Sequence, residues 1–225
     1  MGGVLVTGGG VRPRPERLRV LYLTASSAGD LRVDEEIRRV KAGVRATLHR
    51  DLVEIEHLSA ATTDDLLDGL TRFRPHVVHF SGHANAGVLV FDTGRDRRGP
   101  GLQVPARAFA AALASVDSPP RLVVLNACKS QPQLAELIAG GIGLAVGMAD
   151  SIGDPAAIAF ATRFYTSLAD GQSVRGAHAT GKADLAMKNL PDADLPVLEH
   201  APTIDPAQTV LVEPPRPSQP APTMA

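Results

Sequence analysis

Short apolar runs alternate with amphipathic segments along most of this chain, and this alternation constrains the fold more than any other feature. The clearest runs are residues 18–24, 77–81, 122–126 and 144–148, each bounded by polar residues. Runs of this length are typical of strands that are buried on both faces. The pattern therefore predicts an α/β fold, a three-layer sandwich in which a mostly parallel sheet carries helices on both faces.

The segments between the runs have the periodicity of helices. Val33, Ile37, Val40, Val44 and Leu48 follow a 3.6-residue rhythm. Acidic residues open this expected helix and basic residues close it, as the helix dipole favours. Thr62 and Thr63 are suitable caps for a second helix. The remaining expected elements are helices over 106–116, 133–139, 155–169 and 173–187, an edge strand over 53–58, a hairpin from 88–91 and 101–104, and a last strand over 209–212.

The two ends of the chain differ from its middle. Residues 1–17 combine a glycine-rich stretch with prolines, and residues 213–225 are rich in proline. Proline removes backbone donors and favours extended conformations. We expect a flexible leader over 1–17, one domain over 18–212 and a flexible tail over 213–225.

Composition excludes several classes of function. The 225 residues carry a formal net charge of −1, which leaves no basic excess for binding nucleic acid directly. A single cysteine allows neither an intramolecular disulfide nor a cysteine-rich zinc site. No apolar run approaches the length of a membrane span, and the first ten residues lack the pattern of a signal peptide. We expect a cytoplasmic protein without membrane contact, metal or other cofactor.

His83 and Cys128 each follow a predicted buried strand by one or two residues. Open parallel sheets hold their sites just beyond the carboxyl ends of the strands. A thiol attacks as thiolate, and an imidazole nearby can take its proton. Acyl transfer also needs backbone donors for the developing oxyanion, for which we expect the amides of Cys128 and Ala84. Gly82 is expected to let the chain bend before the histidine.

Taken singly, neither residue establishes a site. A lone cysteine is commonly a small buried hydrophobe, and a histidine after a strand is often a loop residue. Their shared place at the ends of two apolar strands is what favours a catalytic pair. His79, inside its strand, lacks the further ligands of a metal site, and a buried, hydrogen-bonded histidine is the expected reading.

Two segments resemble the signature motifs of CHAT-domain peptidases, in the clan of caspases, separases and gingipains. They are His-Val-Val-His-Phe-Ser-Gly-His at 76–83 and Leu-Val-Val-Leu-Asn-Ala-Cys-Lys-Ser at 122–130. The spacing of about 45 residues between His83 and Cys128 is close to that of caspases. The likeness spans roughly 18–190 and implies a caspase-like fold, hydrolysis of a protein substrate by a His83–Cys128 dyad, and control by a protein partner, as in defence or cell-death pathways. The family usually has glycine where Ala84 stands.

Specificity is less defined by the sequence. Asn126 stands where caspases carry Gln and metacaspases an acidic residue. Relatives that cleave after Arg or Lys place carboxylates in the first substrate pocket, and Asp30 and Asp150 are the candidates here. Both aspartates also suit helix caps or loops. The alternative functions are a non-catalytic interaction module with a CHAT-like fold and, from topology alone, a nucleotide-binding regulator.

Overall fold

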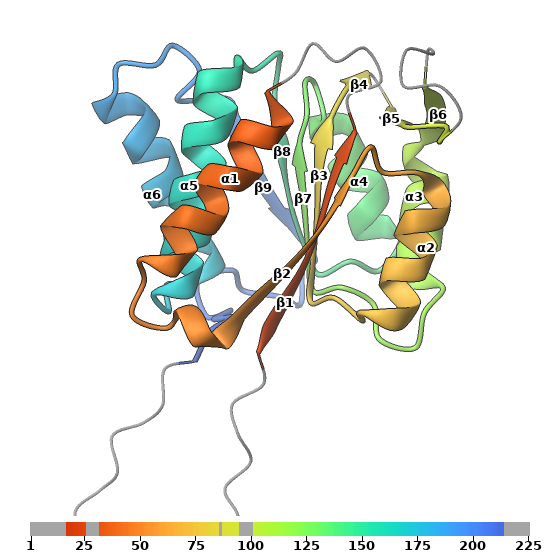
Figure 1. Cartoon of the computed structure of the whole chain (residues 1–225), viewed down its shortest axis with the longest axis horizontal. Coiled ribbons are helices and arrows are strands. Elements are labelled where there is room, and N and C mark those ends of the chain that lie inside the picture. The colour runs from red at the N-terminus through yellow and green to blue at the C-terminus, as the bar shows by residue number, and fades with distance from the viewer. Residues whose placement is uncertain (1–16, 26–31, 86, 95–100, 214–225) are drawn as a thin grey trace, which may run out of the picture.

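A six-stranded sheet forms the centre of the molecule (Figure 1). The computed structural model describes residues 17–25, 32–85, 87–94 and 101–213. The strand order is β2-β1-β3-β7-β8-β9, and all neighbours are parallel except β8 and β9. The strands are β1 Leu18–Ala25, β2 Val53–Ser59, β3 Val77–Gly82, β7 Leu122–Asn126, β8 Leu144–Met148 and β9 Pro196–His200.

Helices cover both faces of this sheet. Figure 1 shows α1, α5 and α6 on one face and α2, α3 and α4 on the other. Their bounds are α1 Val33–Arg45, α2 Thr63–Arg72, α3 Ala106–Ala114, α4 Gln131–Ala139, α5 Asp154–Ala169 and α6 Val174–Met187, with a short 3-10 helix over Arg50–Leu52. The expected three-layer α/β architecture is confirmed.

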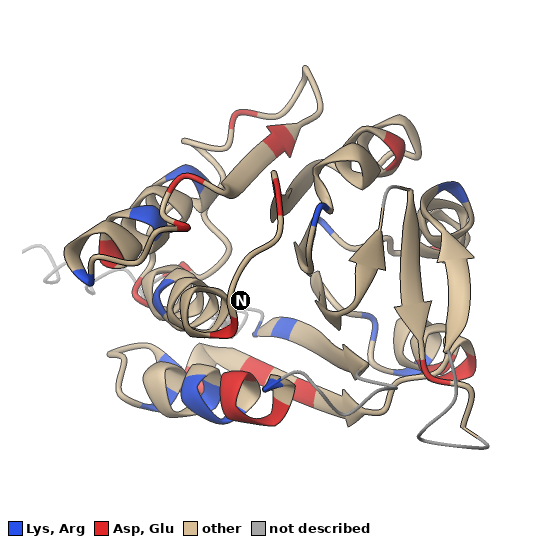
Figure 2. Ribbon diagram, turned by 90° about the horizontal axis from the view of Figure 1, so that it is seen from above, with Lys and Arg blue, Asp and Glu red and all other residues tan. Residues whose placement is uncertain are grey.

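The sheet separates two hydrophobic cores because successive side chains of a strand point to opposite faces. In β1, Val20 and Tyr22 pack into the core under α1 and α5, whereas Leu21 and Leu23 pack into the core under α2 and α3. Figure 2 shows that the charged residues gather mainly on the outer helices. β3, β7 and β8 contain no Lys, Arg, Asp or Glu at all, as strands buried on both faces require.

Most predicted elements form close to their expected bounds. Thr62 caps α2, accepting from the Asp65 amide while the Asp65 carboxylate accepts from the Thr62 amide. The first helix ends at Arg45, earlier than its apolar rhythm predicts, and Leu48 is 85% exposed. The chain turns after Val44, so Leu48 no longer lies on the buried helix face.

A second, three-stranded sheet stands beside the carboxyl edge of the main one. It consists of β4 Ala84–Asn85, β5 Val88–Phe91 and β6 Leu102–Pro105, all antiparallel. The predicted hairpin is β5 and β6, so that expectation is confirmed. The sequence did not predict β4, which has only two residues.

The prediction of a last strand over 209–212 is wrong. Those residues form only an isolated bridge between Val210 and Ser173. The last strand is instead β9, which pairs antiparallel with β8. It begins with Pro196 and is largely half-buried or exposed, so it lacks the continuous apolar run that marks the central strands.

The expected leader and tail are outside the part of the chain that is described, apart from Arg17 and Glu213. Their flexibility therefore stays a prediction.

Candidate active site

His83 and Cys128 occupy equivalent positions at the carboxyl edge of the main sheet. β3 and β7 are parallel neighbours, and their last registered pair is Ser81 with Asn126. His83 follows Ser81 by two residues, and Cys128 follows Asn126 by two. Adjacent strands lie about 4.8 Å apart, so the two chain segments leave the same edge of the sheet next to each other, one toward His83 and the other toward Cys128.

Gly82 is required by a close approach rather than by a bend. A Cβ at this position would lie 2.5 Å from the Ala25 carbonyl oxygen and 3.1 Å from the ring of Phe80. Its backbone does not adopt the left-handed conformation that favours glycine. The expectation of a sharp bend is thus replaced by tight packing of β3 against β1.

The segment after the histidine is extended and paired. The His83 carbonyl accepts from the Val90 amide at 3.0 Å, and Ala84 pairs with Leu89 in the small sheet. Ala84 therefore begins a strand. An extended conformation suits alanine as well as glycine, so the departure from the family pattern at this position introduces no backbone strain.

Cys128 lies in the turn after β7 and is partly buried. Its thiol donates to the Ile152 carbonyl, with Sγ 3.8 Å from the oxygen. The next residue, Lys129, has a φ of 52°, and its amide donates to the Asp150 carbonyl at 3.1 Å. The cysteine turn is therefore attached to the loop between β8 and α5.

The Ser130 side chain also holds the turn that contains Cys128. Its buried hydroxyl donates to the Leu125 carbonyl and accepts from the Met148 amide, both at 2.9 Å. One side chain thus links the end of β7 to the end of β8. Sequence reasoning did not single out Ser130, although it lies in the cysteine motif.

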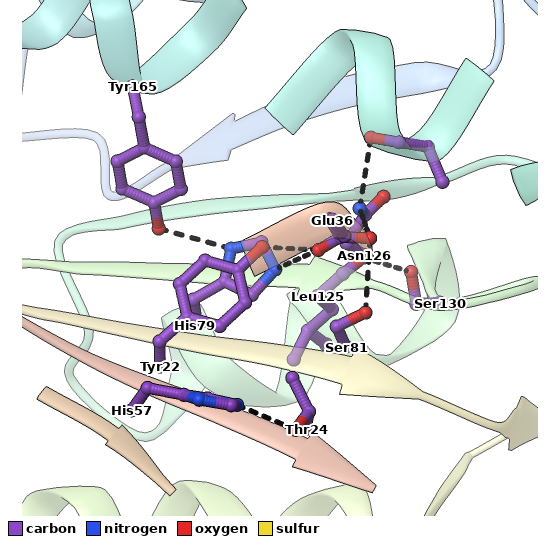
Figure 3. Close-up of polar contacts among 11 residues, drawn as sticks. Tyr22, Thr24, Glu36, His57, His79, Ser81, Leu125, Asn126, Ser130 and Tyr165 are labelled. Atoms are coloured by element: carbon purple, nitrogen blue, oxygen red, sulfur yellow. Dashed lines mark hydrogen bonds and ion pairs between the residues drawn. The ribbon is translucent and has the colours of Figure 1, made fainter. Parts of the chain in front are cut away.

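Glu36 in α1 has a buried carboxylate that contacts side chains of three neighbouring strands, β1, β3 and β7 (Figure 3). Glu36 is only 3% exposed. Its Oε1 accepts from the Tyr22 hydroxyl and lies 3.1 Å from Nε2 of His79. Its Oε2 accepts from the Ser81 hydroxyl at 3.2 Å and from the Asn126 amide at 2.9 Å. Ser81 and Asn126 are the residues two positions before His83 and Cys128, so one carboxylate ties both strand ends together.

His79 extends this cluster to α5. Its Nδ1 lies 3.1 Å from the Tyr165 hydroxyl, and its ring stacks on Tyr22 with centroids 3.9 Å apart. Burial lowers the pKa of His79, while Glu36 acts in the opposite direction. Burial and the nearby Glu36 raise the pKa values of Tyr22 and Tyr165. The expected buried, hydrogen-bonded histidine is confirmed.

A small cavity opens beside Cys128, between the ends of β3 and β7 and the first turns of α1 and α5. Glu36, Ser81 and Asn126 line it together with apolar side chains, and Asp154 lies at the start of α5. The Asp154 carboxylate accepts from the Arg32 amide at 3.2 Å.

Neither aspartate proposed from the sequence lines this cavity in the described part of the chain. The Asp150 side chain is 66% exposed, with Oδ1 3.7 Å from the Lys129 ammonium. Asp30 lies outside the described residues. The pocket role of both stays a prediction, and the carboxylates that do line the cavity belong to Glu36 and Asp154.

The described residues contain no cluster of three or more His, Cys, Asp or Glu side chains arranged for a metal ion. In the same part of the chain, no helix combines the length and apolarity needed to cross a membrane.

A family model described as the CHAT domain matches residues 26–208, which include both motifs. The chain belongs to the CHAT domain family. The resemblance to CHAT domains that the His83 and Cys128 motifs carry is confirmed.

One curated relative of this CHAT domain is named "Probable protease" and comes from Gillisia limnaea. The two sequences are 28% identical over 141 residues, which cover 61% of this chain and 24% of the relative. The chain therefore spans about a quarter of the length of that protein.

One solved structure similar to this CHAT domain is a secreted C11 cysteine protease from Bacteroides thetaiotaomicron, determined in complex with an irreversible peptide inhibitor. The TM-score is 0.55 with 13% sequence identity, and the match covers 76% of this chain and 60% of that chain. At this identity the likeness concerns the fold, and it confirms the caspase-like α/β architecture.

The motifs of the CHAT domain thus located the strand ends, but they did not reveal the groups that support them. Glu36 was visible in the sequence only as one of three acidic residues that open a helix. Its apolar neighbour Ile37 and the helical rhythm put position 36 near the buried face, and this was the available signal.

Proposed function

We propose that this CHAT domain is a cysteine endopeptidase that cleaves a protein substrate, with Cys128 as nucleophile and His83 as base. The register of β3 and β7 supports the proposal, because each residue follows the last registered pair, Ser81 with Asn126, by two positions at the carboxyl edge of a parallel sheet. A small cavity of about 30 Å³ lies beside the thiol at the same edge.

The chemistry would follow the usual course of thiol acyl transfer. His83 takes the thiol proton, and Cys128 Sγ attacks the scissile carbonyl carbon to form a C–S bond. The carbonyl oxygen becomes an oxyanion, for which the Cys128 and Ala84 amides are the proposed donors. His83 then protonates the leaving amine, and water cleaves the thioester to release the acid and restore the thiol.

Regulation by a protein partner is part of this proposal. The thiol donates to the Ile152 carbonyl, and the Lys129 amide donates to the Asp150 carbonyl, so the β8–α5 loop holds the nucleophile. A partner that moves this loop would free the thiol for His83. A place in bacterial defence or cell death, in the cytoplasm, is proposed from the family resemblance.

The test is a peptide library incubated with the wild type and with Cys128→Ala and His83→Ala. Cleavage by the wild type should fall by at least about a thousandfold in both variants, since the nucleophile and the base act as a unit. Equal cleavage by Cys128→Ala would refute the proposal.

A non-catalytic interaction module is the second candidate, and the bond from the Cys128 thiol to the Ile152 carbonyl favours it. A module of this kind would show no rapid labelling of Cys128 by a peptidyl electrophile, whereas a peptidase would.

A further inference from the structure

The pairing of the strands that lead to His83 and Cys128 ends before either residue is reached. Ser81 with Asn126 is the last registered pair of β3 and β7. Beyond this pair the two segments enter different elements, since His83 leads into the small sheet and Cys128 leads into α4. Catalysis by a dyad depends on a fixed geometry between its members. A contact between the small sheet and α4 can supply what strand pairing no longer does.

Gln133, in the first turn of α4, makes such a contact. Its Nε2 donates to the Asn85 carbonyl at 2.8 Å, and the Val88 carbonyl oxygen lies 3.4 Å from the same nitrogen. Asn85 and Val88 are the paired residues on either side of the turn between β4 and β5. Asn85 directly follows Ala84, whose amide is the proposed oxyanion donor. One side-chain amide therefore connects the helix beyond the nucleophile to the strand beyond the base.

Both ends of this link are held by contacts of their own. At the start of α4, the Gln133 amide donates to the Ser130 carbonyl at 3.2 Å, and the Ser130 hydroxyl links the ends of β7 and β8. In the small sheet, the Gly87 carbonyl accepts from the Ala106 amide at 2.8 Å, at the start of α3. The glutamine side chain thus spans two segments that are each anchored to the main body of the fold.

The side chain of Gln133 is poorly suited to stabilise the fold by burial. It is 1% exposed, and both carbonyls can only accept, so its nitrogen must face the small sheet. Its Oε1 is buried without a donor among the described residues. Such an oxygen is costly, and glutamine is mostly an exposed residue in proteins. An apolar side chain of the same length would fill this space at less cost, so the bonds to the small sheet are what glutamine adds.

We propose that Gln133 is a positioning residue of the peptidase, which holds His83 and the Ala84 amide in place relative to Cys128 through its bonds to the small sheet. It acts through the β4–β5 turn and not on the reacting atoms. Its loss should therefore slow the chemical step more than it weakens substrate binding. This inference rests on the proposed peptidase function.

The first arm of the test is Gln133→Met, which keeps the length and burial of the side chain and removes the donor. The substrate is the library peptide that the wild type cleaves fastest. kcat should fall by about tenfold to a hundredfold, with KM changed by less than about threefold, because a small misplacement of the catalytic groups is felt in the transition state. Gln131→Met is the matched control on the same helix, at an exposed position, and should equal the wild type.

The second arm is Gln133→Glu, which keeps the shape but turns acceptors toward the two carbonyl oxygens. Its kcat should fall at least as far as that of Gln133→Met. Should Gln133→Glu fail to fold, Gln133→Met alone decides the question. The Tm of Gln133→Met should lie within about 5 °C of the wild type, because the amide adds little stability.

The pH profile of kcat/KM separates positioning from a merely structural role. Its acid limb reports ionisation of the essential groups of the free enzyme. In Gln133→Met this limb should move by at least about half a pH unit, because the imidazole is no longer held where it takes the thiol proton. The profile of Gln131→Met should coincide with that of the wild type.

The outcomes separate the two proposals. Cysteine-dependent cleavage with the same kcat and pH profile in folded Gln133→Met overturns the positioning role and leaves the peptidase function intact. A fall in kcat that sucrose restores, with the acid limb unmoved, shows a loss of stability alone and also overturns it. If the wild type shows neither cysteine-dependent cleavage nor labelling of Cys128 by peptidyl electrophiles, the peptidase function is overturned, and the inference with it.

Discussion

The two faces of the central sheet are built from the same strands but differ in the side chains that they bury. On the face under α2 and α3, Val78 and Phe80 of β3 meet Val123 and Leu125 of β7 in a core of apolar side chains. On the face under α1 and α5, the same strands begin with apolar residues and end in His79, Ser81 and Asn126, which are buried and polar.

This difference follows the alternation of the strands. His79 and Ser81 share one parity in β3, and Val124 and Asn126 share one in β7. The last polar residues on this face, Ser81 and Asn126, therefore lie two positions before the proposed catalytic residues. The core on one face is made of apolar side chains, whereas the other face buries polar groups that depend on hydrogen bonds to one another.

The largest expected effect is a loss of stability on substitution of Glu36, at the centre of the polar face. Glu36→Leu has a similar volume but leaves the donors of Tyr22, His79, Ser81 and Asn126 without their acceptor. Removing one partner of a buried charged network costs about 3–5 kcal/mol. For a domain of this size that corresponds to a fall in Tm of roughly 10 °C or more, measurable by circular dichroism. A loss below about 1 kcal/mol would mean that the polar face behaves as the apolar one does.

The sequence predicted the apolar face far better than the polar one. Continuous apolar runs located β1, β3, β7 and β8 within one or two residues, because burial on both faces requires apolar residues at successive positions of a strand. The motifs also placed His83 and Cys128 correctly at the strand ends. Both signals are local in the chain.

The polar cluster cannot be recognised from any short stretch of the sequence. Glu36 lies on a helix that is distant in sequence from Asn126, and its partners come from three different strands. Only the register of β1, β3 and β7 brings them together, and a register is not visible in a single sequence. The sequence also did not indicate that Asp154 lines the cavity, and Asp150, four positions earlier, was proposed instead.

The second prediction tests whether the Glu36 carboxylate is the centre of the polar face. Tyr22→Phe removes one hydroxyl and keeps the ring that stacks on His79. Hydrogen bonds to charged groups contribute about 1.5–3 kcal/mol, so we expect a loss of about 2 kcal/mol in the free energy of unfolding by urea. Tyr165→Phe is the matched variant, because its hydroxyl meets only the His79 imidazole among the described contacts, and it should cost about 1 kcal/mol or less. The reverse order would contradict this account.

The third prediction concerns the apolar face. Phe80→Leu removes a ring that packs on Phe91 with centroids 5.0 Å apart, but it leaves no polar group unsatisfied. This large-to-small change of a buried side chain leaves a cavity and should cost about 1–2 kcal/mol, less than truncation to alanine. The same denaturation series should therefore show a smaller loss than Glu36→Leu, although both variants end in leucine.

The smallest expected effect is a dependence of stability on pH that belongs to the polar face. Burial lowers the pKa of His79 below its ordinary value of 6.5, and the unfolded chain restores that value. Below pH 6.5 the unfolded state therefore binds more protons than the folded state, and stability falls as the pH is lowered. The same direction applies to His57 and His178, whose pKa values burial also lowers.

His79→Gln isolates the share of His79 in this dependence. One such histidine can contribute up to about 1.4 kcal/mol per pH unit within its window, so the loss between pH 7.5 and 5.5 should be about 1 kcal/mol smaller in His79→Gln than in the wild type. His200→Gln, at an exposed position in β9, serves as the control and should keep the full dependence. If His79→Gln and the wild type lose the same stability over this range, the imidazole is not held neutral by burial, and the hydrogen bonds of the polar face do not depend on its neutral form.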